Sequence, residues 1–441
     1  MRQPLYLAPK AAVDPATTHR ANVLAMLMLL ALPFIQLGLT YWASVQGVIF
    51  LLVALFVLKG ISRLQLLMFV IIAVSLLMSL MGHLYSDTLL YAFFRILRQI
   101  LSLYLIVCAA NTLSWRPKDY FFDVALPFVV VALSALVILQ FLTYTLLGWT
   151  YLFLPAELFI AGFSTIADHW IDFAATHGLV ADVRAAGTYA EPSYFGFIAL
   201  SLAFLVLRGV QDGVRKTWLL GLMLVAVICS KSASGVVLYV LLLLFAFRQR
   251  LTLPIICCVL LVLALGLVGA DLLLDFHLLE RLSNITNPAL EPSGYIRLIL
   301  PLKHIALVLQ HKPLGVPLSE FFTFTSQHLS EYVGGSIGPV QLLKGVSSGT
   351  DNGFLNLFVS FGLGGFVLVG LFPFIVKDGL ILVFLLFVCQ FNGDIFAPDK
   401  VAVIALVVSC RRVINVSVAP AKRPVRFTPP GPFGAMVPRR T

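Results

Sequence analysis

The stretch Arg184-Ala-Ala-Gly-Thr-Tyr-Ala-Glu191-Pro192-Ser-Tyr-Phe-Gly-Phe197 joins a charged, glycine-containing strip to a long apolar run. Proline is favoured in the first turn of a helix, because its missing N–H has no helical partner there in any case. The sequence therefore predicts a helix from Pro192 to about Leu207, with Glu191 at its start. The free N–H groups and the positive dipole end of such a helix attract anions. The plain alternative is a loop followed by an ordinary capped helix.

The composition of the whole chain is that of a protein embedded in lipid. Of the 441 residues, 60% are hydrophobic and 11% are charged, whereas soluble proteins use about 45–50% apolar residues. The formal net charge of +10 does not indicate binding to nucleic acid, because the basic residues lie in short turns between apolar runs and in the C-terminal tail. That placement is typical of cytoplasmic loops. We therefore expect an all-α polytopic integral membrane protein.

The apolar runs predict about twelve transmembrane helices within residues 23–410. In chain order they are 23–41, 46–58, 64–81, 89–110, 121–147, 192–207, 218–229, 236–247, 253–270, 353–376, 380–391 and 401–410. The runs 218–229 and 236–247 are shorter than the roughly 20 residues of a straight crossing, so they either borrow flanking residues or are tilted and broken. Residues 1–22 form a polar N-terminus, and 411–441 form a basic tail that should be disordered.

The distribution of positive charge predicts the orientation. With the N-terminus in the cytoplasm, the basic turns alternate onto the inner side and both termini lie inside. Two long loops, 149–191 and 271–352, then lie outside, and the second contains a helix-like piece around 297–310. No repeated halves of the kind common in transporters are evident in the sequence.

Arg95 and Arg98 lie within the apolar run 89–110. They are three residues apart and so share a helix face. At about 1.5 Å per residue they lie roughly 9–14 Å below the outer end of that run. Charges inside a membrane are costly and are usually functional or paired. The two arginines can bind a diphosphate at the outer leaflet, or they can pair with a carboxylate of a neighbouring helix, and the sequence leaves both interpretations open.

The second outer loop ends in Gly349-Thr-Asp351-Asn352-Gly-Phe354, directly before an apolar run. Asp351 is thus expected at the membrane surface, as Glu191 is. A carboxylate at a helix start is commonly an N-cap; the alternative is a general base that takes a proton from a sugar hydroxyl. The sequence contains no metal-ligand pattern, no hydrolase motif and no phosphate-binding Gly-rich loop, so we expect no metal ion and no cofactor.

Three places together resemble the O-antigen polymerase and ligase superfamily (Wzy-like) of bacterial envelope proteins. The strip Arg184 to Ser193 is similar to that family's Arg-x-x-Gly-x-x-x-x-Pro strip, and its Glu-Pro-Ser form is closest to the exopolysaccharide repeat-unit polymerases. Ser293-Gly-x-x-Arg297 followed by His311-x-Pro-Leu-Gly-Val316 resembles the large-loop signature. Asp351-Asn-Gly-Phe-Leu355 followed by Gly362-Leu-Gly-Gly365 resembles the family's His-Asn-x-x-Leu step into a span. The resemblance covers about residues 180–375.

The resemblance implies a membrane-embedded, GT-C-like glycosyltransferase of the bacterial inner membrane that needs no metal ion. It would polymerise undecaprenyl-diphosphate-linked oligosaccharide repeat units at the periplasmic face, with a lipid-linked glycan as both donor and acceptor. A flippase and a chain-length regulator would be its partners besides the bilayer. Asp351 or Glu191 would act as the base. The diphosphate and the sugars would be bound by Arg184, Arg297, Arg281, Arg95, Arg98, Asn352 and His311.

Two alternatives belong to other classes of function. One is an O-antigen-type ligase, against which Asp351 argues because ligases of the family have histidine at that step. The other is a transporter or flippase of lipid-linked oligosaccharides. A transporter should carry charges near the middle of several spans, whereas most charges here lie in the expected outer loops.

Overall fold

The structure is a computed structural model that describes part of the chain. The described residues are 23, 25–37, 70, 73–74, 77, 90, 93, 97, 100–101, 104, 120–154, 184–189, 191–249, 261, 264, 268–269, 299–316, 324, 327–328, 352–375, 378–391 and 398–410. Within them the elements are helices, apart from an isolated bridge at Leu37, which confirms the expected all-α class. Two of these helices, Phe121–Leu147 and Pro192–Gly209, are long and apolar enough to cross a membrane. The expected total of about twelve spans stays a prediction.

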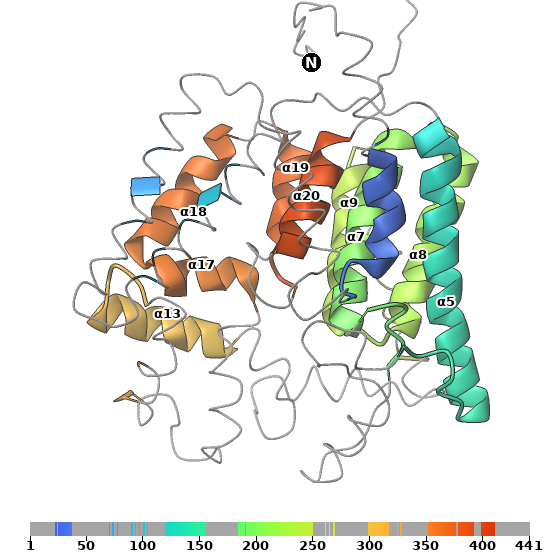
Figure 1. Cartoon of the computed structure of the whole chain (residues 1–441), viewed down its shortest axis with the longest axis horizontal. Helices are drawn as coiled ribbons and strands as arrows, with labels where there is room; N and C mark the ends of the chain where they lie inside the picture. The colour runs from blue at the N-terminus through green and yellow to red at the C-terminus, as the bar shows by residue number, and fades with distance from the viewer. Residues whose placement is uncertain are drawn as a thin grey trace, which may run out of the picture.

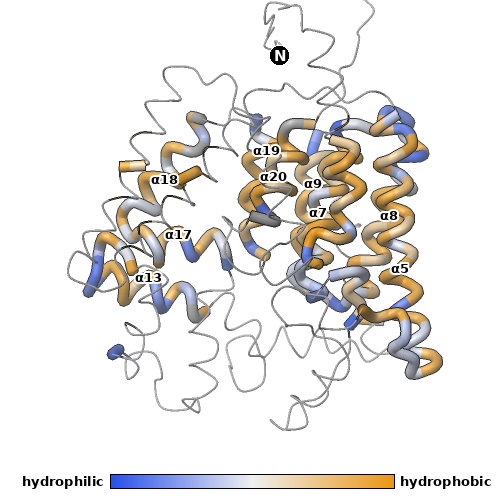
Figure 2. Tube along the Cα trace, in the orientation of Figure 1, coloured by the Kyte–Doolittle hydropathy of each residue, from blue (hydrophilic) through white to orange (hydrophobic). Residues whose placement is uncertain are grey.

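A bundle of apolar helices forms the core of the described structure (Figure 1). Its members are α5 (Leu126–Leu147), which continues the π-helical turn η3 (Phe121–Ala125), α7 (Pro192–Gly209), α8 (Gly213–Cys229), α9 (Ala233–Phe247), α19 (Gly379–Val388) and α20 (Pro398–Ser409). The N-terminal helix Ala25–Phe34, which ends in the 3-10 turn η1 (Leu32–Phe34), packs on this core. Figure 2 shows that hydrophobic residues dominate these helices.

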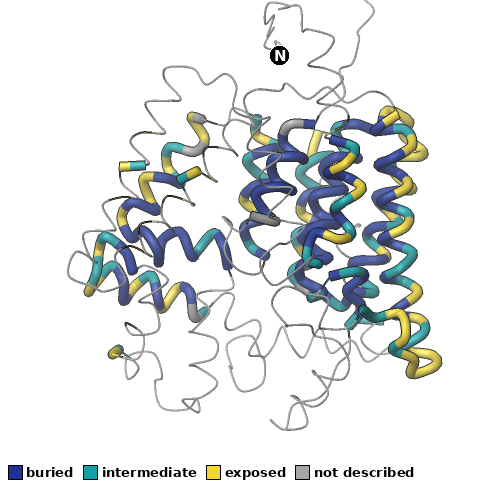
Figure 3. The backbone as a smooth tube through the Cα atoms, in the orientation of Figure 1, coloured by how far each residue is buried: buried dark blue, intermediate teal, exposed yellow. Residues whose placement is uncertain are grey.

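Helix α7 lies at the centre of the bundle and contacts α5, α8, α9, α19 and α20. It begins at Pro192, as predicted, and is buried along nearly all of its length (Figure 3). Gly196 permits the close packing, because a Cβ at this position would lie 2.9 Å from a ring carbon of Phe391 and 3.2 Å from the Cα of Gly235. The strip at the start of the helix is therefore attached to a helix that is buried along nearly all of its length.

The two short apolar runs of the sequence are lengthened by flanking residues. Helix α8 starts at Gly213, five residues before the apolar run, and is capped by Asp212, whose carboxylate accepts a hydrogen bond from the N–H of Val214. Helix α9 starts at Ala233 and is capped by Ser232. The hydroxyl of Tyr239 donates to the carbonyl of Leu220 at 2.9 Å and ties the two helices together.

The expected single helix over 353–376 is wrong. The chain forms α17 (Gly353–Phe361) and α18 (Leu363–Ile375), separated at Gly362, whose φ of +50° is left-handed. The physical reason is a backbone contact with the second loop, because the carbonyl of Pro313 accepts the N–H of Leu363 at 2.8 Å. A Cβ on Gly362 would lie only 2.0 Å from that same carbonyl oxygen.

The helix-like piece of the second loop is α13 (Leu300–His311), which packs on α17. In Figure 1 both helices lie across the direction of the bundle. The turn after α13 is held by the N–H of Val316, which donates to the carbonyl of Val359 at 2.9 Å. Most of the expected spans 46–58, 64–81, 89–110 and 253–270, and the tail 411–441, lie outside the described residues.

Candidate functional site

The strip before α7 is held by Gln140, a fully buried residue of α5. Its Oε1 accepts the N–H groups of Ala186 and Gly187 at 3.2 and 2.8 Å, and its Nε2 donates to the carbonyl of Gly187 at 2.8 Å. A further bond runs from Nε2 to the carbonyl of Leu152 at 2.9 Å. The side-chain amide of Gln140 thus binds the backbone near the beginning of the first long loop, at Leu152, and near its end, at Ala186 and Gly187. Gln140 belongs to none of the motifs of the sequence.

Position 187 requires glycine because of its backbone conformation and because of the side chains that surround it. Its φ of +68° is left-handed, a region that side chains with a Cβ rarely occupy. A Cβ here would also lie 3.2 Å from a methyl group of Val137. The glycine of the Arg-x-x-Gly strip therefore allows the tight backbone turn that Gln140 binds.

Two side chains of the strip bind the end of the N-terminal helix. The hydroxyl of Thr188 donates to the carbonyl of Pro33, and the hydroxyl of Tyr189 donates to the carbonyl of Leu32 at 3.1 Å. Burial raises the pKa of Tyr189 far above its usual value, so this phenol is a neutral donor. Arg184 is half-buried at the beginning of a strip that is fixed from two sides.

Glu191 immediately precedes α7, but its carboxylate makes no capping bond to the helix. Instead Oε2 accepts a hydrogen bond from the hydroxyl of Ser193 at 2.9 Å. The backbone carbonyl of Glu191 accepts the N–H groups of Tyr194 and Phe195 at 3.0 and 3.3 Å. The plain interpretation of Glu191 as a side-chain N-cap is therefore wrong, and its half-buried carboxylate is oriented by Ser193.

Asn352 is the N-cap of α17. Its Oδ1 accepts the N–H groups of Phe354 and Leu355 at 3.1 and 3.0 Å. Its Nδ2 donates to Oε1 of Gln390 at 2.7 Å, just beyond α19. The N–H of Phe354 also donates to the carbonyl of Cys389 at 2.9 Å. The start of α17 is thus joined to the end of α19.

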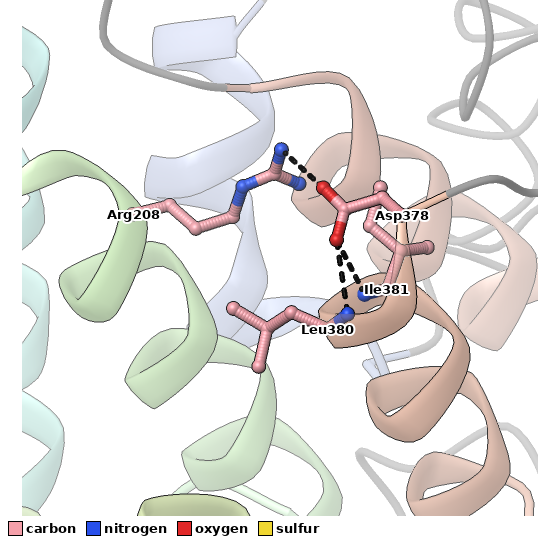
Figure 4. A network of polar contacts seen from close by, with 4 residues as sticks. All are labelled: Arg208, Asp378, Leu380 and Ile381. Atoms are coloured by element: carbon pink, nitrogen blue, oxygen red, sulfur yellow. Dashed lines mark hydrogen bonds and ion pairs between the residues drawn. The ribbon is translucent and has the colours of Figure 1, made fainter. Parts of the chain in front are cut away.

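The starts of α7 and α17 both lie at the C-terminal end of α19. The ring of Phe391 packs on that of Phe197, in the second turn of α7, with centroids 6.5 Å apart, and the neighbouring Gln390 holds Asn352. At the opposite end of the pair, Arg208 of α7 binds Asp378 at the start of α19 at 3.2 Å (Figure 4). Helices α7 and α19 therefore run antiparallel. The C-terminal ends of the two long loops, which lead into α7 and α17, lie on the same side of the bundle.

His311 is the last residue of α13. Its ring stacks on that of His328 with centroids 4.2 Å apart, and Phe324 packs on His328 at 4.7 Å. About two helical turns earlier, His304 is fully buried, and this burial lowers its pKa to about 3. The imidazole of His304 is therefore neutral at physiological pH.

The other predicted site residues lie outside the described part of the chain: Asp351, Arg297, Arg281, Arg95 and Arg98. Among the described residues, no group of three or more His, Cys, Asp or Glu side chains could hold a metal ion. Among the described site residues, Arg184 and Glu191 lie on the strip before α7, Asn352 lies at the start of α17, and His311 ends the helix that packs against α17.

The described part of the chain is an apolar helical bundle with polar strips at its helix starts, and two of its helices are long and apolar enough to cross a bilayer. The family model of the WcaD colanic acid polymerases matches residues 21–413, and the chain belongs to this family. It is a polymerase of the inner membrane that joins repeat units into an exopolysaccharide. The expected resemblance to exopolysaccharide polymerases is confirmed. Comparisons with curated proteins and with solved structures found no match.

Proposed function

We propose that the enzyme joins undecaprenyl-diphosphate-linked repeat units at the periplasmic face of the inner membrane, in a site between the starts of α7 and α17. The observation that carries the proposal is the meeting of these two helix starts at one end of α19. Membership of a polymerase family supports lipid-linked oligosaccharides as substrates. About twelve spans with both termini in the cytoplasm would place this end of the bundle outside.

In the proposed reaction, a hydroxyl of the acceptor glycan attacks the anomeric carbon of the donor. The glycosidic bond forms while the bond between that carbon and the diphosphate oxygen breaks, and undecaprenyl diphosphate leaves with the bonding electrons. A carboxylate takes the hydroxyl proton, as a general base. We assign this step to Asp351, with Glu191 as the alternative, because both precede the two helices whose starts adjoin.

The negative charge that develops on the leaving diphosphate requires cationic donors in a site with little water. Arg184 suits this task, because its strip is fixed by Gln140, Thr188 and Tyr189. Arg297, Arg281, Arg95 and Arg98 complete the proposed set. With arginines stabilising the leaving group, the chemistry needs no metal ion. Asn352 and His311 are assigned to the sugars.

The test is an analysis of lipid-linked glycans in a strain that lacks the gene. Single repeat units on the lipid carrier should accumulate on the periplasmic side, and the intact gene should restore long chains. Accumulation on the cytoplasmic side would instead indicate a flippase. Long lipid-linked chains that fail only to reach their final acceptor would indicate a ligase. A flippase and a chain-length regulator are the proposed partners, and co-purification of the tagged full-length protein tests both.

A further inference from the structure

Helix α17 carries a buried polar face. Asn352, Asn356 and Ser360 are spaced by four residues, so they lie above one another on the same side of the helix. All three residues are buried, with exposed fractions of 1%, 5% and 6%. Figure 3 shows that α17 is buried along most of its length. A helix that needed only to pack against apolar neighbours would place apolar side chains on this face.

The two asparagines on this face differ in their hydrogen bonds. Asn352 uses both ends of its amide, in the cap of α17 and in the bond to Gln390. Asn356 is in the next turn, and no described residue donates a hydrogen bond to its buried Oδ1. An unsatisfied buried acceptor lowers stability, and it is uncommon enough to require an explanation. A leucine of similar size would avoid that cost.

The position of Asn356 suggests what it binds. It lies one helical turn, about 5–6 Å between Cβ atoms, from Asn352, and Asn352 is where the two helix starts meet. A sugar hydroxyl both donates and accepts hydrogen bonds, so it can satisfy either end of an amide. A phosphate oxygen in its ionised form only accepts, and it cannot satisfy Oδ1. The ligand chemistry that fits is therefore a glycan hydroxyl.

We propose that Asn356 binds a hydroxyl group of a repeat-unit sugar that enters the site beside Asn352. The inference rests on the proposed function, which brings a glycan to the start of α17. The proposal adds one binding residue within the apolar run that follows Asp351. This residue lies outside the segment Asp351 to Leu355 that resembles the family's motif. In this role the amide contributes to substrate affinity and not to the stability of the fold.

The experiment uses the full-length protein, reconstituted with purified lipid-linked repeat units. Asn356→Leu should raise KM for the repeat unit by about tenfold, the scale of one hydrogen bond, and leave kcat close to that of the wild type. Its Tm should equal or exceed that of the wild type, because a buried unsatisfied acceptor is removed. Asn352→Leu should lower Tm, because the cap and the bond to Gln390 are lost.

Ser201→Ala is the matched control. Ser201 is also a fully buried polar residue of a core helix, but its hydroxyl is satisfied by the carbonyl of Phe197 at 2.8 Å. We expect the control to keep the KM of the wild type. An unchanged KM in Asn356→Leu overturns the proposal. A lower Tm, or loss of folded protein, in Asn356→Leu overturns it too, because the amide would then support the fold, for example through a buried water molecule. A wild-type protein that does not extend the lipid-linked units contradicts the proposed function itself.

Discussion

At the scale of single residues, the cap of α17 and the base that we propose belong to two neighbouring residues, Asn352 and Asp351. The cap of α17 comes from Asn352, so the proposed base at Asp351 is not required for capping. Asp351→Asn should keep the fold and lower the rate of chain formation by about 10²–10⁴-fold, the usual scale of general acid–base catalysis. The measurement is polymer formation by the reconstituted variant, with Tm recorded on the same sample.

Asp212→Asn is the control for this change. Asp212 is an exposed aspartate that caps α8, and asparagine caps a helix about as well as aspartate does. The control should keep both Tm and activity. Chain formation near the wild-type rate in Asp351→Asn would assign the base to another residue, with Glu191 the next to test.

A second prediction at this scale concerns Gln140. Gln140→Leu removes the partners of two buried N–H groups and of the carbonyl of Gly187, and each buried group left unsatisfied costs about 1–3 kcal/mol. Chain formation should fall because Arg184 loses its fixed position, and hydrogen exchange should rise at residues 184–189. Thr143→Ala, on the same helix, removes only bonds to that helix's own backbone and should change neither. Unchanged exchange in Gln140→Leu would show that the strip does not depend on this amide.

Gln140 also shows where prediction from sequence stops. The strip from Arg184 to Pro192 was recognisable because its charge, glycine and proline stand together, and the helix that follows was predicted to within two residues. A lone glutamine in an apolar run carries no comparable signal. Its partners are 46 and 47 residues away in the chain, so only the packing of α5 against the strip reveals its role.

At the scale of helices, the break between α17 and α18 is the feature that the apolar pattern did not predict. Hydropathy continues through Gly362 without interruption, and the break depends on a carbonyl contributed by Pro313. Gly362→Ala should destabilise the protein by at least about 1–2 kcal/mol, the cost of a left-handed backbone for a residue with a Cβ. Thermal unfolding of the purified variant measures this effect.

Gly370→Ala provides the comparison for that variant. Gly370 lies in α18 with open space around it and an ordinary helical φ. Alanine favours the helix over glycine by up to about 1 kcal/mol, so this variant should be as stable as the wild type or slightly more stable. Equal stability of Gly362→Ala and Gly370→Ala would mean that the contact between the second loop and this junction does not stabilise the fold.

The stability of helix α13 should depend on pH because of His304. The pKa of His304 is about 3 in the folded state and 6.5 when exposed. Above about pH 6.5 the imidazole of His304 is neutral in both the folded and the unfolded state, and α13 has its full stability. As the pH falls from 6.5 towards 3, only the unfolded state takes up the proton, so stability is lost by up to about 1.4 kcal/mol per pH unit. Hydrogen exchange of α13 between pH 7 and 5 measures this loss, and His304→Phe should remove the pH dependence.

At the scale of the whole molecule, the charge alternation predicts which segments face outward. A reporter that is active only in the periplasm should be active when fused after residues 165 and 330, and inactive after residues 212 and 420. The antiparallel arrangement of α7 and α19 agrees with this scheme, because it brings the ends of both long loops to one side. Activity after residue 420 would contradict both the even number of spans and the cytoplasmic tail.

The bond between Arg208 and Asp378 has a consequence for how the protein is made. The two residues are 170 positions apart in the chain, and translation proceeds at about 5–20 residues per second. For roughly 10 to 30 s, α7 has therefore left the ribosome before the carboxylate that will neutralise its arginine has been synthesised. The ion pair of the helix at the centre of the bundle therefore forms only after a further 170 residues have been synthesised. A chain that is truncated before Asp378 lacks this ion pair.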